Sequence, residues 1–232
     1  MTKTALTGAR VFDGAVLHEN AAVLLSDGCF EAIVPAAEAQ GVNITDLGGG
    51  ILSPGFVDVQ VNGGGGVLFN DQPDSIALKI MAEAHVSLGA TRILPTLITD
   101  TRDKVEAAIE AVDEACRNGM RGIAGLHLEG PHLDPVKCGA HDRDLIRPMD
   151  ADDLAVLCYA AGRLPSLLIT VAPESVSPEQ IAALVGEGAT VSLGHSNCTS
   201  DAAEKAFAAG ASMATHLFNA MSQLNSREPG LV

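Results

Sequence analysis

Three residues of the sequence have side chains that commonly bind metal ions and lie at or near the ends of apolar runs. They are Glu129, His195 and His216. Two histidines and one carboxylate form a common catalytic zinc set, which leaves one position open for water. A cation held in this way activates water and polarises a carbonyl group. A single histidine is more often an ordinary polar residue, but three candidate ligands at three strand ends favour a metal site.

The apolar runs alternate with helical patterns from Pro54 onward, which predicts a parallel sheet with right-handed crossovers. In a (β/α)₈ barrel, catalytic groups lie at the C-terminal ends of the strands, so the three residues would share one rim. The six predicted strands are Phe56–Val61, Arg92–Ile98, Ile123–Glu129, Leu167–Ala172, Thr190–His195 and Met213–Phe218.

The predicted helices between these strands have recognisable ends. An apolar stripe that ends at Cys116 is followed by Gly119, a residue typical of helix stops. Ser177 and Gln180 have the spacing of a capping box, with Pro178 at the first helical position. These signals support the alternation of strands and helices.

The chain divides into two predicted parts. Residues 1–53 contain short apolar runs separated by Asp13-Gly14 and Asp27-Gly28, which are hairpin signals, and we expect a small β-rich module there, part of a β-sandwich. A complete barrel needs about 250 residues, whereas residues 54–232 supply 179. We therefore predict an α/β fold in which a (β/α)₈-type barrel in 54–232 is incomplete, with about six βα units.

Composition excludes several classes of partner. The net charge of −15 argues against nucleic acid and anionic membranes. Five scattered cysteines without a C-x-x-C pair fit a reducing compartment. The N-terminal residues contain no long apolar stretch, so we expect no secretory signal and a cytoplasmic protein.

Several segments together resemble a known family. Ser53-Pro-Gly-Phe-Val-Asp58 is similar to the entry strand of the amidohydrolase superfamily. Within that superfamily, four further segments and Arg227-Glu-Pro-Gly230 resemble the N-acetylglucosamine-6-phosphate deacetylases. The four segments are Leu126-His-Leu-Glu-Gly-Pro131, Val171-Ala-Pro-Glu174, Gly194-His-Ser-Asn197 and Thr215-His-Leu-Phe-Asn-Ala-Met221.

The resemblance implies roles for particular residues. Glu129, His195 and His216 match the family's ligands for a divalent metal ion, which we expect to be zinc. The residues that match its substrate-binding positions are Ala140, His141, Asn219, Ala220 and Arg227. Arg227 matches a phosphate-binding arginine that reaches into a neighbouring subunit in the family, so we expect a homodimer or homo-oligomer. A guanidinium group pairs well with phosphate oxygens, and it supplies local positive charge in an acidic protein.

The chain differs from related sequences at two places. Many amidohydrolases have His-x-His at the end of the first strand, where this chain has Gln60 and Asn62. Amides are weak zinc ligands, so we predict one metal ion, with Gln60 and Asn62 orienting water or substrate or hydrogen-bonding the glycine-rich loop. The family's acid/base aspartate has no counterpart in the sequence, and we expect it beyond Val232.

The leading hypothesis is therefore metal-dependent hydrolysis of the acetamide of a small-molecule sugar phosphate, N-acetylglucosamine-6-phosphate. Without the aspartate, this chain could be inactive alone. Two alternatives are a non-catalytic fragment that binds metal and sugar phosphate, and an amidohydrolase that acts on another amide.

Overall fold

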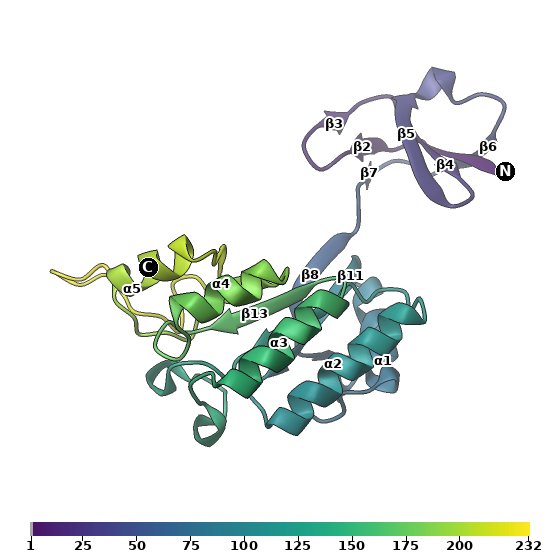
Figure 1. Cartoon of the computed structure of the whole chain (residues 1–232). Helices are drawn as coiled ribbons and strands as arrows, with labels where there is room; N and C mark the ends of the chain where they lie inside the picture. The colour runs from purple at the N-terminus through teal and green to yellow at the C-terminus, as the bar shows by residue number, and fades with distance from the viewer. Residues whose placement is uncertain (1) are drawn as a thin grey trace. The chain divides into compact units, whose positions relative to one another are not determined.

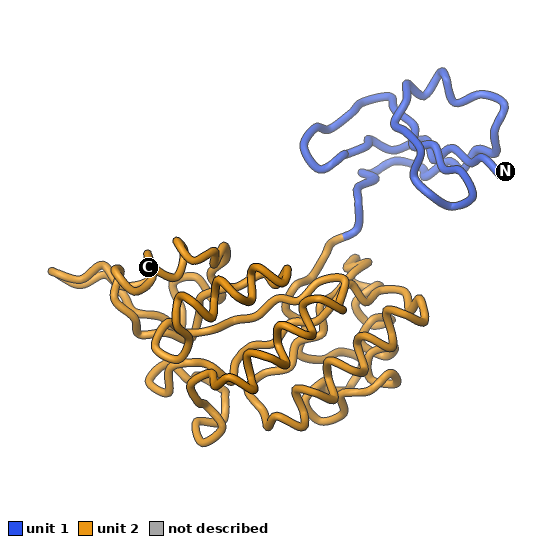
Figure 2. Tube along the Cα trace, viewed as in Figure 1, with its two compact units in different colours: residues 1–55 blue, residues 56–232 orange. Residues whose placement is uncertain are grey.

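The computed structural model describes residues 2–232, and the chain divides between Gly55 and Phe56 into two compact units (Figure 2). The larger unit has one hydrophobic cluster of buried residues, and the N-terminal unit has two small ones. No helix within residues 2–232 is long and apolar enough to cross a membrane.

The N-terminal unit is built from two small sheets (Figure 1). One has the strand order β5-β4-β1-β6 and the other β3-β2-β7. Asp27 and Gly28 both have positive φ and join β4 to β5, as the Asp-Gly hairpin signal predicted. The elements are β1 (Lys3–Thr7), β2 (Arg10–Phe12), β3 (Leu17–His18), β4 (Ala21–Ser26), β5 (Cys29–Pro35), the 3-10 turn Ala36–Glu38, β6 (Asn43–Asp46) and β7 (Ile51–Leu52).

The larger unit is a six-stranded parallel sheet whose strands follow in chain order, β8-β11-β12-β13-β14-β15. This confirms the predicted α/β fold with about six βα units. The strands are β8 (Phe56–Val61), β11 (Ala90–Ile98), β12 (Leu126–Glu129), β13 (Leu167–Val171), β14 (Thr190–Leu193) and β15 (Met213–Ala214), with a small ribbon of β9 (Gly63–Gly64) and β10 (Val67–Leu68).

Helices connect these strands and cover one face of the sheet, where α1, α2 and α3 lie side by side (Figure 1). The predicted capping box at Ser177 and Gln180 is present at the start of α4. The helices are α1 (Ser75–Val86), α2 (Arg102–Arg117), α3 (Ala151–Arg163), α4 (Pro178–Gly186) and α5 (Ser200–Ala208), with 3-10 turns at Pro135–Lys137 and Arg143–Leu145.

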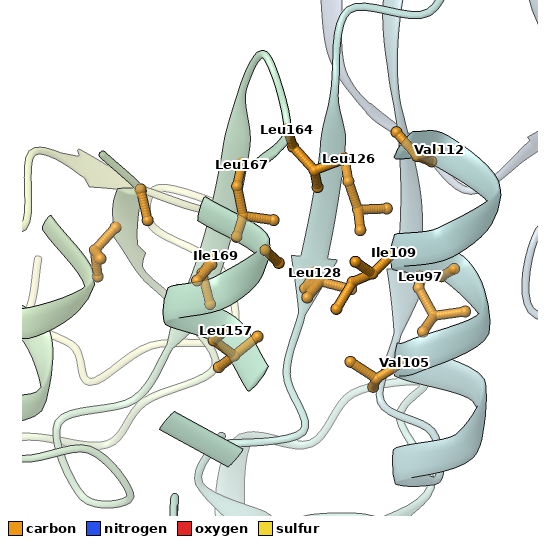
Figure 3. Packing of buried hydrophobic residues seen from close by; sticks show 14 of the residues in the cluster. Leu97, Val105, Ile109, Val112, Leu126, Leu128, Leu157, Leu164, Leu167 and Ile169 are labelled. Carbon is orange, nitrogen blue, oxygen red and sulfur yellow. The ribbon is translucent and has the colours of Figure 1, made fainter. Parts of the chain in front are cut away.

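The alternating pattern of β12 explains how the sheet presents polar groups on its other face. Leu126 and Leu128 pack against Ile109 of α2 and other apolar side chains of the helices (Figure 3). His127 and Glu129 alternate with them and therefore face the interior of the half-barrel. The same alternation places Thr170 and Ser192 on the interior face of β13 and β14.

The last predicted strand was too long. The prediction was Met213–Phe218, but β15 ends at Ala214. His216, Phe218 and Ala220 all have positive φ, which a strand cannot accommodate. The chain turns here, and this turn carries the last of the candidate ligands.

Candidate functional site

The candidate site is centred on the carboxylate of Glu129, which lies at the C-terminal end of β12 and is buried. Glu129 Oε1 lies 2.8 Å from His216 Nε2 and 3.2 Å from His195 Nε2. Glu129 Oε2 accepts a hydrogen bond of 3.0 Å from the amide of Gln60 and lies 3.8 Å from His141 Nε2. Side chains from four different strand ends or loops therefore converge on one carboxylate.

The loop after β14 presents His195 in an unusual backbone conformation. The residue has φ +48°, and its carbonyl accepts a hydrogen bond from the Asp134 amide. The imidazole Nδ1–H donates to the Lys137 carbonyl at 2.8 Å. Because this bond holds one proton on Nδ1, Nε2 is the nitrogen that can give a lone pair to a cation.

His141 has the opposite arrangement. Its Nδ1 accepts a hydrogen bond from the Thr99 backbone amide at 3.2 Å, so its remaining ring proton is on Nε2. A nitrogen that carries a hydrogen has no lone pair for a cation. The atoms of Glu129, His141 and His195 lie within 4.8 Å of one another, as a metal site requires, but the tautomer makes His141 a hydrogen-bond donor to a bound ligand.

The remaining set, one carboxylate and two imidazoles, fits a divalent cation such as zinc. The His141 and His216 rings both contact the His195 ring edge-on, with centroids 4.4 and 5.0 Å apart. His216 is more than one-third exposed, so this side of the group is open to a ligand.

Burial and the neighbouring groups both shift the pKa values of the site residues. Burial alone would raise the pKa of Glu129, but the hydrogen bond from His195 and the nearby imidazoles lower this pKa to about 2. Burial lowers the pKa of His141 to about 4, with a further contribution from His195. Burial would also lower the pKa of His195, but the Glu129 and Lys137 hydrogen bonds outweigh it and raise the pKa. A carboxylate thus stays ionised beside a neutral His141.

Glu174 supports the loop that carries His195. Its carboxylate accepts a hydrogen bond of 2.8 Å from the Ser196 hydroxyl, and that hydroxyl oxygen accepts one from the Cys198 amide. The Ser196 backbone also pairs with Ala220. The ligand loop and the turn that contains Ala220 are therefore held together.

The other predicted site residues lie in several environments. Ala140 is exposed directly before His141, and Asn219 is exposed in the turn after β15. Arg227 is exposed, and neither it nor the side chain of Asn62 hydrogen-bonds to any other residue in the range 2–232. The structure brings Gln60 and His141 to Glu129, whereas it shows no such contact for Asn62 or Arg227.

Two features of the site were not found from the sequence. The contact of Thr99 with His141 joins residues far apart in the chain, and no local pattern signals it. The polar residues Thr170 and Ser192 lie inside runs that were predicted as strands from their apolar residues. In β14, the alternation of polar and aliphatic residues is the signal that could have identified Ser192, whereas Thr170 is the single polar residue of β13.

The chain is similar in sequence and in fold to known proteins. The sequence profile of the Amidohydrolase family matches residues 51–228. An N-acetylgalactosamine-6-phosphate deacetylase of Shewanella sp. (strain ANA-3) is 44% identical over 228 residues, which cover 97% of this chain and 57% of that protein. An N-acetylglucosamine-6-phosphate deacetylase of Haemophilus influenzae is 37% identical, over 99% of this chain and 60% of that protein.

A solved structure gives the same result. The N-acetylglucosamine-6-phosphate deacetylase from Pasteurella multocida superposes with a TM-score of 0.93 at 35% identity, covering 99% of this chain and 61% of that protein. This chain thus spans about three-fifths of the length of these relatives. Since the family profile matches most of its residues, the chain belongs to the Amidohydrolase family.

Proposed function

We propose that this chain carries the metal-binding part of an active site that hydrolyses the acetamide of N-acetylglucosamine-6-phosphate to glucosamine-6-phosphate and acetate. The observation that carries the proposal is the convergence of His195 Nε2 and His216 Nε2 on Glu129 Oε1, within 3.2 Å. The names of the similar proteins support the substrate class.

In this proposal Glu129, His195 and His216 hold one divalent cation, zinc. When bound, the cation would activate water and polarise the acetamide carbonyl. The amide of Gln60 donates to Glu129 Oε2 and so fixes the rotation of the carboxylate. The His141 Nε2–H is free to donate to an oxygen of the substrate. A single cation is favoured because Gln60 and Asn62 offer only amides.

The phosphate group needs a separate positive site, because the protein has a net charge of −15. We assign it to Arg227, with Asn219 and Ala220 meeting the sugar phosphate and Ala140 lining the entrance beside His141. Arg227 is exposed and makes no ion pair within the part of the chain that the structure describes, so its guanidinium is available. We further propose a cytoplasmic homodimer or homo-oligomer, in which Arg227 serves a neighbouring subunit.

Hydrolysis also requires a group that passes a proton to the leaving amine. Within residues 2–232, the hydrogen bonds and ion pairs of the cluster involve only one carboxylate, that of Glu129. We therefore propose that a residue outside this cluster passes the proton, because Glu129 holds the cation in this proposal. The same observation favours a second candidate function, in which these 232 residues bind metal and sugar phosphate without turnover.

The relatives differ in the sugar that their names contain. One is an N-acetylgalactosamine-6-phosphate deacetylase and another an N-acetylglucosamine-6-phosphate deacetylase. The two substrates are epimers at C4, and both present the same acetamide and phosphate. The chemistry proposed for Glu129, His195 and His216 is common to both.

The test is to load the chain with Zn²⁺ and measure binding and deacetylation of both epimers, with Glu129→Ala as the variant and Glu204→Ala, an exposed glutamate of α5, as the matched control. Release of acetate that Glu129→Ala abolishes and Glu204→Ala retains would support a complete catalytic site. Stoichiometric Zn²⁺ and sugar-phosphate binding without acetate release would support the binding function. A chain that binds no Zn²⁺ would contradict both.

A further inference from the structure

The interior of the half-barrel contains a continuous chain of buried polar side chains next to the candidate site. Ser192 Oγ lies 2.7 Å from Thr215 Oγ1, which lies 2.8 Å from Thr170 Oγ1. Thr170 Oγ1 lies 2.8 Å from His127 Nε2, and His127 Nδ1 lies 3.2 Å from Thr96 Oγ1. All five are buried. We call these five residues the hydroxyl–imidazole chain.

Hydrogen-bonding capacity fixes the direction of this chain. The Thr96 hydroxyl donates to the Leu94 carbonyl at 3.2 Å and accepts from the Val61 amide at 2.9 Å. Its remaining lone pair accepts from His127 Nδ1–H, so His127 Nε2 must be an acceptor. Thr170 then donates to His127, and each hydroxyl further along the chain donates to the one before it.

The hydroxyl–imidazole chain connects the elements that carry the candidate ligands. His127 precedes Glu129 by two residues on the same face of β12, and Thr170 is aligned with Glu129 across the sheet. Thr215 comes directly before His216. The hydroxyl–imidazole chain therefore links, through side-chain hydrogen bonds, the backbone segments that carry Glu129 and His216.

Gly194, directly before His195, lies against the same chain. A Cβ at this position would lie 2.9 Å from Thr215 Cβ and 3.1 Å from Thr170 Cγ2. The backbone that leads to His195 thus packs closely on two of the hydroxyl-bearing residues. All three candidate ligands are within two residues of the hydroxyl–imidazole chain or of Gly194, which packs against it.

We propose that the hydroxyl–imidazole chain is a positioning layer for the metal site. It sets the positions of Glu129, His195 and His216 relative to one another. Barrel interiors are usually filled with branched aliphatic side chains. Aliphatic contacts are non-directional, whereas a directed series of hydrogen bonds fixes each strand end relative to the next. The inference rests on the proposed metal site and adds positioning residues to it.

The test compares Thr215→Val, which keeps the shape and removes the hydroxyl, with Thr215→Ser, which keeps the hydroxyl. Thr190→Val on β14 is the matched control, because this threonine is outside the chain. The readouts are Zn²⁺ affinity by competition with a chromophoric chelator and the absorption spectrum of the Co²⁺-loaded protein, which reports coordination geometry. Mutation of a residue that hydrogen-bonds a metal ligand typically lowers the affinity for the metal by about 10- to 100-fold.

We expect Thr215→Val to weaken Zn²⁺ binding by about tenfold or more and to alter the Co²⁺ spectrum. Thr215→Ser and Thr190→Val should keep the wild-type affinity and spectrum. Wild-type behaviour of a folded Thr215→Val would overturn the positioning layer while leaving the metal site intact. If Thr215→Val does not fold, Ser192→Ala at the end of the chain decides: an altered Co²⁺ spectrum supports the layer and an unaltered one overturns it. Absence of Zn²⁺ binding by the wild-type chain would overturn the metal site and the layer with it.

Discussion

At the scale of single residues, hydrogen bonding gives two neighbouring histidines different chemistry. His195 donates from Nδ1 to a carbonyl, and His141 accepts at Nδ1 from an amide. Both rings point Nε2 toward Glu129, so distance alone does not separate a ligand from a donor. The hydrogen-bond partner of Nδ1 makes the distinction, because it decides whether Nε2 carries a lone pair or a proton.

This distinction predicts different outcomes for the same substitution. His195→Gln should lower Zn²⁺ affinity by at least about 100-fold, because a ligand itself is lost. Loss of a residue that only hydrogen-bonds a ligand costs up to about 100-fold. His141→Gln should keep the affinity and weaken binding of the sugar phosphate. Calorimetric titration with Zn²⁺, and then with the sugar phosphate, measures both. Equal loss of Zn²⁺ affinity in the two variants would show that His141 is also a ligand.

His127 predicts a dependence of stability on pH. Burial lowers the pKa of its imidazole to about 4, against 6.5 for an ordinary histidine. Between these values the unfolded chain takes up a proton that the folded chain does not, so this residue's contribution to stability is lost as pH falls from 6.5 to 4. The full effect is about 3 kcal/mol.

His127→Gln should therefore be less stable than the wild type at pH 7.5, with a difference that shrinks at pH 5. Urea unfolding at the two pH values measures both differences. If the difference in stability between the two proteins were the same at both pH values, the pKa of His127 would not differ between the folded and the unfolded chain.

At the scale of elements, a buried carboxylate connects α2 to α3. Asp153 accepts hydrogen bonds from Arg102 and Arg147 at 2.9 and 3.0 Å, and it forms a capping box with Asp150 at the start of α3. Its side chain is buried, whereas that of the neighbouring Asp152 is 84% exposed. The two aspartates allow a matched comparison.

Asp153→Asn should lower the free energy of unfolding by about 2 kcal/mol, because charged hydrogen bonds to a buried group are lost. Asp152→Asn should change it by less than about 0.5 kcal/mol, as expected for an exposed ion pair. Burial opposes ionisation of Asp153, but the arginine contacts outweigh it and lower its pKa, so its contribution is present at neutral pH and is lost in acid. Urea unfolding at pH 7 measures the difference, and equal effects of the two variants would contradict it.

The sequence predicted the elements well where the signal was local. The capping box at Ser177 and the hairpin at Asp27 depend on residues a few positions apart, and both are present. The end of β15 was wrong because non-glycine residues with positive φ, such as His216, have no pattern in the sequence. Such conformations are held by tertiary contacts that join distant parts of the chain.

The candidate site shows the same limit. Glu129, His195 and His216 were predicted to lie together because parallel strands end at one rim, which follows from topology, and the structure brings them together. The tautomer of His141 and the hydroxyl–imidazole chain depend on hydrogen bonds between separate strands. Only the assembled half-barrel makes those contacts visible.

At the scale of the larger unit, the sheet is open. β8 and β15 are its two edge strands, and within residues 2–232 each pairs with only one neighbour. On β8, Phe56 is 71% exposed and Val57 60% exposed. An exposed apolar edge strand tends to pair with another chain. We therefore expect self-association of the 232-residue chain.

Charge decides the conditions under which this association occurs. A net charge of −15 makes copies of the chain repel one another at low ionic strength, and salt screens that repulsion. Association through the apolar edge should therefore increase as salt is added. An association driven by ion pairs would weaken instead, so the sign of the salt effect separates the two causes.

Val57→Lys places a charge on the edge strand and should reduce the association at every salt concentration. Ile76→Lys is the control, because Ile76 is exposed to a similar extent (63%) but lies on α1 and not on a strand. Size-exclusion chromatography with light scattering at two salt concentrations measures the mass of each variant. If the wild-type chain stays monomeric in high salt and unfolds cooperatively, the edge strand does not cause self-association. If both lysine variants reduced association equally, added charge rather than blocking of the edge would be the cause.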